Sequence, residues 1–184
     1  MNTFLPPNYE RPATGGGNYA KLEDGANRFR ILTNAIVGFL YWTRDNKPVR
    51  LRTYPAAPPE DMREGDKIKH FWAFVVWNYR DAKIQVLEIT QATIQGPLED
   101  LVTSEDWGDP KEYDITITKK GQKLDTEYTV MPSKPSAVPI EAGRAYRALR
   151  IDLEKLFDGG DPFGGEREAT PEITQEDTPF PPRF

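Results

Sequence analysis

Aromatic rings and basic side chains are interleaved in two stretches of the sequence, at 39–54 and 69–80. Such a mixture could bind a single-stranded nucleic acid, because exposed base faces stack on rings while phosphates attract cations. Each stacked base contributes on the order of 1–3 kcal/mol. The candidates for these contacts are Tyr41, Trp42, Lys47, Arg50, Arg52, Tyr54, Lys69, Phe71, Trp72, Trp77 and Tyr79.

Most of these rings have a second interpretation as core residues, because aromatic side chains dominate protein cores. Aromatic residues make up 11% of the chain and include four tryptophans. Alternate residues of a strand point to opposite faces. We therefore expect either Phe71, Trp77 and Tyr79 or Trp72 and Phe74 to face outwards, but not both sets.

The alternation at 49–54 is the sharpest local signal in the sequence. Arg50, Arg52 and Tyr54 occupy every second position, so two guanidinium groups and a ring are expected on one strand face. A solvated outer face is the alternative. A second basic cluster lies at the tip of a predicted hairpin, which is beside the nucleic-acid groove in an OB barrel. Its members are Lys119, Lys120 and Lys123.

Composition excludes the chemistry that needs thiols or several histidines. The chain has no cysteine and one histidine, so a Cys/His zinc site or a nucleophile with a His base lacks its parts. His70 is interpreted as a polar strand residue. Carboxylates could still bind magnesium, but the sequence has no acidic cluster beside a phosphate-binding glycine loop. We expect no cofactor, no metal ion and no enzymatic activity.

The net charge of −5 is unusual for a DNA-binding protein, but the charges are unevenly distributed. Residues 26–83 carry eleven bases and six acids, a net charge of +5. Residues 157–184 carry seven acids and two bases, which accounts for the whole net charge of the chain. A locally basic region in a neutral body is therefore available to an anionic ligand.

The apolar pattern predicts a mainly β domain. A helix is expected where Ile94, Leu98, Leu101 and Val102 recur at helical spacing, and Asp152 could cap a last short helix. The first helix precedes the last two strands, which is the order of an OB-fold five-stranded β-barrel, here with extra strands. Strands are expected at 28–32, 36–43, 49–54, 71–79, 83–90, 113–118 and 126–130.

Flexible segments are expected at both ends of the chain. Residues 1–18 are rich in proline and glycine, and residues 158–184 add acids, so neither can offset its ordering entropy. The OB domain is thus expected at 19–157. Acids near the end of the tail could occupy a basic groove, and a phenylalanine could dock in a partner's pocket, although a solubility tail is the alternative. The tail candidates are Glu176, Asp177, Phe180 and Phe184.

Five stretches of the sequence carry a further signal: NYAKLEDGANRFRIL at 18–32, KHFWAFVVWNY at 69–79, IQVLEITQ at 84–91, DWGDP at 106–110 and LFDGGDPF at 156–163. Together they resemble a family of bacteriophage single-stranded DNA-binding proteins. The resemblance implies an OB fold, sequence-tolerant binding of single strands and a role in phage replication, recombination or repair in the cytoplasm of an infected bacterium. Residues 176–180 are also similar to the acidic tip of bacterial single-stranded DNA-binding proteins, although four residues follow Phe180 here.

These observations predict a non-enzymatic protein that coats and protects single-stranded DNA. Its expected partners are single-stranded DNA and, through a tail that also competes with DNA, replication or recombination proteins. No membrane is expected among them, because no run of about eighteen apolar residues occurs. The alternatives are an RNA or general nucleic-acid-binding OB protein, a magnesium-dependent nuclease and a structural phage protein.

Overall fold

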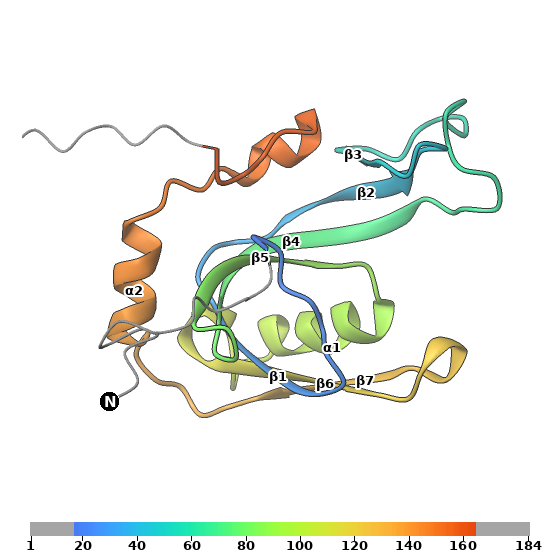
Figure 1. Cartoon of the computed structure of the whole chain (residues 1–184). Helices are drawn as coiled ribbons and strands as arrows, with labels where there is room; N and C mark the ends of the chain where they lie inside the picture. The colour runs from blue at the N-terminus through green and yellow to red at the C-terminus, as the bar shows by residue number, and fades with distance from the viewer. Residues whose placement is uncertain (1–16, 165–184) are drawn as a thin grey trace, which may run out of the picture.

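A single antiparallel sheet dominates the computed structural model, which describes residues 17–164 (Figure 1). Its strands within that range are β1 Gly25–Ile31, β2 Ile36–Trp42, β3 Pro48–Leu51, β4 Lys69–Asn78, β5 Lys83–Ile89, β6 Asp114–Lys120 and β7 Glu127–Pro132. The helices are α1 Ala92–Thr103 and α2 Ile140–Arg147, with 3-10 turns η1 Pro110–Glu112, η2 Lys123–Asp125 and η3 Leu153–Asp158.

The sheet is organised around β4, which was predicted to be a central strand because it is apolar on both faces. β4 pairs with β5 along one edge and with β2 and then β1 along the other. β1 continues to β6 and β6 to β7, while α1 connects β5 to β6. The predicted mainly β class and the helix before the last two strands are confirmed. The structure shows an open sheet, in which β5 and β7 are not joined by a strand pairing among residues 17–164.

The principal core lies on the inner face of the curved sheet. Side chains that alternate along the strands meet there, and α1 adds Ile94 and Leu98 from its apolar stripe. Figure 1 shows α1 between the layer of β4 and β5 and the layer of β6 and β7. The buried members are Phe29, Ile31, Phe74, Val76, Leu87, Ile89, Ile94, Leu98, Tyr113, Ile115 and Ile117.

The outer face of β4 and β5 is covered by the end of the described chain. We call residues 140–163 the C-terminal cover; it contains α2 and η3 (Figure 1). Ala142 of α2 and Leu156 of η3 are fully buried in the two clusters that form beneath it. Gly38 of β2 leaves room for this packing, because a Cβ there would lie 3.0 Å from the Phe157 ring.

The cover differs in two ways from the sequence-based expectation. α2 was not foreseen, because its amphipathic stripe is short. The folded chain also extends past the domain boundary expected at residue 157: Asp152 N–H donates to the Pro162 carbonyl at 2.9 Å, and Phe163 packs on both outer clusters. The predicted cap is confirmed, since the Asp152 carboxylate accepts from Glu154 N–H at 3.0 Å, although the helix it begins is a 3-10 turn.

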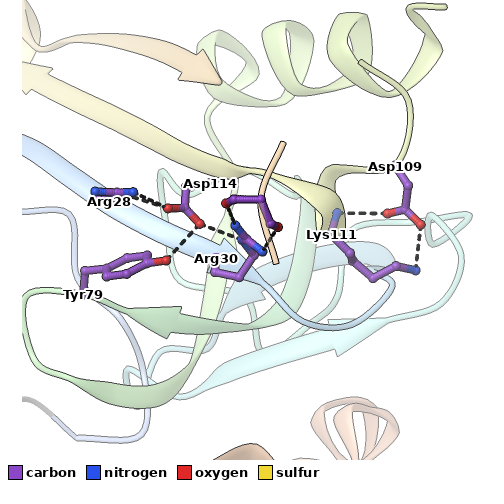
Figure 2. Close-up of polar contacts among 7 residues, drawn as sticks. Arg28, Arg30, Tyr79, Asp109, Lys111 and Asp114 are labelled. Carbon is purple, nitrogen blue, oxygen red and sulfur yellow. Dashed lines mark hydrogen bonds and ion pairs between the residues drawn. The ribbon is translucent and has the colours of Figure 1, made fainter. Parts of the chain in front are cut away.

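A buried polar network ties β1 to β6 and to the segment before α2 (Figure 2). Arg30, whose side chain is inaccessible to solvent, donates to Asp114 at 2.6 Å and to the Ser136 hydroxyl at 2.7 Å. Arg28 Nε and the Tyr79 hydroxyl donate to the same carboxylate at 2.9 and 3.0 Å. Burial, reinforced by this hydrogen bond, raises the pKa of Tyr79, so its phenol remains a donor.

Candidate nucleic-acid interface

β2, β3 and the start of β4 extend beyond the rest of the sheet as an arm, residues 36–72 (Figure 1). Three rings lie side by side on one face of this arm. Phe39 and His70 are register partners whose ring centres are 5.5 Å apart. Tyr54 packs edge-on against Phe39 with ring centres 5.3 Å apart, and it is 63% exposed. We call Tyr54, Phe39 and His70 the ring row.

The same face continues towards α1 through the next register pair, Val37 and Trp72. Val37 is half exposed, and the partly buried Trp72 forms one wall of a pocket of about 520 Å³. The remaining wall comes from α1, the loop between β1 and β2, and η1. Rings and apolar side chains therefore form a continuous surface from the arm to the pocket.

The opposite face of the arm carries the two predicted arginines. Arg50 is register partner of Leu40, and it pairs with Glu88 of β5 at 2.6 Å in a largely buried contact. Arg52 pairs with Glu154 of the cover at 2.6 Å, and its guanidinium lies 4.3 Å from the centre of the Phe157 ring. Arg50 is thus engaged within the fold, whereas Arg52, with a side chain 63% exposed, can still reach solvent.

The expectation that Arg50, Arg52 and Tyr54 share one strand face is wrong. β3 ends at Leu51, and the chain bends over the next two residues. Tyr54 therefore packs against Phe39, the register partner of Leu51, on the face opposite to Arg50. Period-2 counting assumes a continuous strand and therefore does not include this bend at residues 52 and 53.

Several predicted aromatic residues are parts of the packed interior. Phe71 is fully buried and Trp77 is 6% exposed, both beneath the C-terminal cover, so neither ring presents a face to a base. Tyr41 is also 6% exposed and donates its hydroxyl to Asp61 at 3.0 Å. Trp42 is partly buried at the end of β2. Tyr79 belongs to the Asp114 network.

The predicted lysines lie at three places on the surface. Lys47, in the turn between β2 and β3, and Lys69, at the start of β4, are exposed on the arm. Lys119 pairs with Asp24 at 3.0 Å beside the β6–β7 hairpin. Lys120 and Lys123 are exposed at the hairpin tip. Cations therefore flank the ring-bearing arm and occupy the terminal hairpin, but they do not form one cluster.

Phe39, His70 and Val37 were not among the selected candidates, although the structure places them on the open face with Tyr54 and Trp72. The available signal was the period of two in β2 and β4, which puts 37 with 39 and 70 with 72. Sequence alone did not show which of the two faces of each strand is covered.

The tail candidates Glu176, Asp177, Phe180 and Phe184 lie outside the described residues. Within residues 17–164, no group of three or more His, Cys, Asp or Glu side chains could hold a metal ion. No helix in the same part of the chain has the length and apolar character needed to cross a membrane.

Comparison with known proteins gives one informative match. No family model matches the chain. No solved structure matches it. A protein of Escherichia phage T5, named "Probable ssDNA-binding protein", is 28% identical over 148 residues, which cover 64% of this chain. The chain spans 57% of the length of that relative. The sequence is thus similar to part of a phage protein whose name assigns it to single-stranded DNA.

Proposed function

We propose that the chain is a sequence-independent single-stranded DNA-binding protein, and that its sheet is a variant of the OB fold. The order β5-β4-β1-β6-β7, with α1 between β5 and β6, supports this fold, which is a partly open five-stranded Greek-key barrel. The similarity to the phage T5 protein supports the ligand. The observation that carries the site is the exposed ring row on the arm.

The ring row supplies stacking surfaces that do not depend on sequence, because every base has a π-face. Tyr54 offers the largest exposed ring, and Phe39 holds it edge-on. Lys47, exposed in the turn at the end of the arm, can neutralise phosphates. Lys69 is the register partner of Leu40 and so lies, like Arg52, on the face opposite to the ring row. Duplex DNA is disfavoured, because its base faces are already stacked on one another.

The arm also agrees with the way OB folds bind nucleic acid. Oligonucleotides usually contact the second and third strands together with the loops between strands one and two and between strands four and five. In this chain the outer face of β4 and β5 is occupied by the C-terminal cover. In the proposed OB fold, β1, β4, β5, β6 and β7 are strands one to five. The arm therefore lies in the connection between strands one and two, and the β6–β7 hairpin contains the loop between strands four and five. We place the DNA path on these two parts.

The proposed role is to coat and protect single strands during phage replication, recombination or repair, inside the infected bacterium and without an enzymatic step. The acidic tail would compete with DNA and recruit partner proteins, as its charge and its two phenylalanines indicate. Competition with DNA and recruitment of partners both need residues beyond 164, so these two roles rest on the sequence.

The decisive experiment is a titration of tryptophan fluorescence with poly-dT, a duplex and an RNA of equal length, in one buffer. Binding should be strongest for poly-dT and should weaken with salt, because bound cations displace counterions from the phosphates. Tighter binding to the duplex would overturn the proposal. Tighter binding to the RNA would replace it with the RNA-binding alternative.

A further inference from the structure

The pocket beside Trp72 has features that the packing of the fold does not explain. It lies where the arm meets the body, between the β1–β2 loop, the second half of α1 and η1. Apolar side chains dominate its wall, and Val37 and Val102 remain half exposed at its mouth. A volume of about 520 Å³ is within the range of small-molecule sites.

The shape and chemistry of the wall fit a flat aromatic ligand. Trp72 provides an indole, and Ile31, Leu98 and Val102 provide aliphatic contacts around it. A few polar residues also line the pocket, and among them Lys111 donates to the Asn34 side chain. A nucleobase has this combination of apolar faces and a polar edge.

The rim does not favour an acidic peptide such as the tail of the chain. Lys111 is the basic residue among the lining residues, and it also pairs with Asp109 at 3.2 Å (Figure 2). Glu99 of α1 adds a further negative charge to the lining. The pocket therefore offers no net positive charge to attract a run of carboxylates.

Continuity with the ring row identifies the source of the base. The register pairs Phe39–His70 and Val37–Trp72 are successive on the same face, so a strand lying along the arm leads directly into the pocket. We propose that the pocket accepts one unstacked nucleobase of the bound strand, inserted against Trp72. This inference rests on the proposed function, since the base belongs to the same single-stranded ligand.

A substitution at the mouth of the pocket tests the proposal. Val102→Trp should fill the space from the exposed side of α1 without disturbing the core, because Val102 is 47% exposed. Affinity for a dT decamer should fall between about fivefold and 150-fold, the equivalent of one lost stacking contact. The salt slope should stay unchanged, because no phosphate contact is removed. Ile140→Trp, which adds the same ring at a 78% exposed site on α2 of the cover, is the matched control.

Methyl NMR of the native protein gives an answer that does not depend on a variant folding. The dT decamer should shift the methyl signals of Ile31, Val37, Leu98 and Val102, whereas an abasic decamer with the same phosphates should leave them in place. Tight dT binding without these shifts would overturn the pocket and leave the proposed function standing. Failure of the dT decamer and of poly-dT to bind would overturn the proposed function and the pocket together.

Discussion

Tyr54→Ala removes the most exposed ring of the ring row and should weaken single-stranded DNA binding. Tyr54 is 63% exposed while its ring lies perpendicular to that of Phe39, so much of the side chain is available to a base. A stacked base contributes on the order of 1–3 kcal/mol by alanine substitution. At 25 °C this corresponds to an increase in Kd between about fivefold and 150-fold.

The same change should have little effect on folding. Tyr54 loses one edge-to-face ring pair, and such pairs contribute about 0.5–1.5 kcal/mol beyond area burial. Urea unfolding should therefore show a modest decrease in the free energy of unfolding. A large loss of affinity together with a small loss of stability identifies a ligand contact and excludes a general disruption of the arm.

Fluorescence anisotropy of a labelled dT oligonucleotide measures the Kd without using protein tryptophans. Tyr54→Phe keeps the ring and should bind like the native protein. Tyr19→Ala is the matched control, because Tyr19 is 38% exposed and lies near Arg50 and Glu88, away from the ring row. A Kd for Tyr54→Ala within about twofold of the native value, less than the smallest stacking contribution, would refute the stacking role of the arm.

In a variant whose only tryptophan is Trp72, poly-dT should quench the tryptophan fluorescence. In a variant whose only tryptophan is Trp77, the fluorescence should not change, because the cover buries this side chain. Equal quenching in the two variants would contradict the proposed DNA path. Asp114→Asn should lower the free energy of unfolding by about 3–5 kcal/mol in urea denaturation, because it leaves the buried Arg30 without a counter-charge; a loss below about 1 kcal/mol would refute this. Deleting residues 165–184, which carry five acids and two bases, should preserve the fold and raise the affinity for single-stranded DNA at low salt. The gain in affinity should be smaller near 0.1 M salt, because the Debye length there is about 10 Å and the tail charge is screened. Equal affinities of the full and shortened chains at the lowest salt would show that the tail does not compete with DNA.

The deletion should begin after residue 164, not at the boundary expected from the sequence. Pro162 is buried, and Phe163 packs on both outer clusters. A cut at residue 158 would remove these contacts and confuse loss of the tail with loss of the cover. The two truncations can be compared by urea unfolding, in which only the longer deletion should reduce stability.

Local patterns were sufficient to identify most of the elements. Alternation at 49–54, 113–118 and 126–130, β-rich composition elsewhere and one run that is apolar on both faces located the seven strands of residues 17–164 within a few residues, and the spacing of Ile94 and Leu98 located α1. These signals depend on neighbours within one strand or one turn of helix. They also indicated a mainly β chain with a helix before the last hairpin, and family resemblance supplied the ligand class.

Tertiary packing decided which residues of each strand are available to a ligand. β4 is apolar on both faces, so its sequence could not distinguish the inner core from the face beneath the cover. The cover, distant in sequence, buries Phe71 and Trp77 and pairs with Arg52, whereas Phe39 and Tyr54 remain on the open side. Alternation assigns residues to two faces of a strand, but only contacts with distant segments determine which of those faces meets solvent.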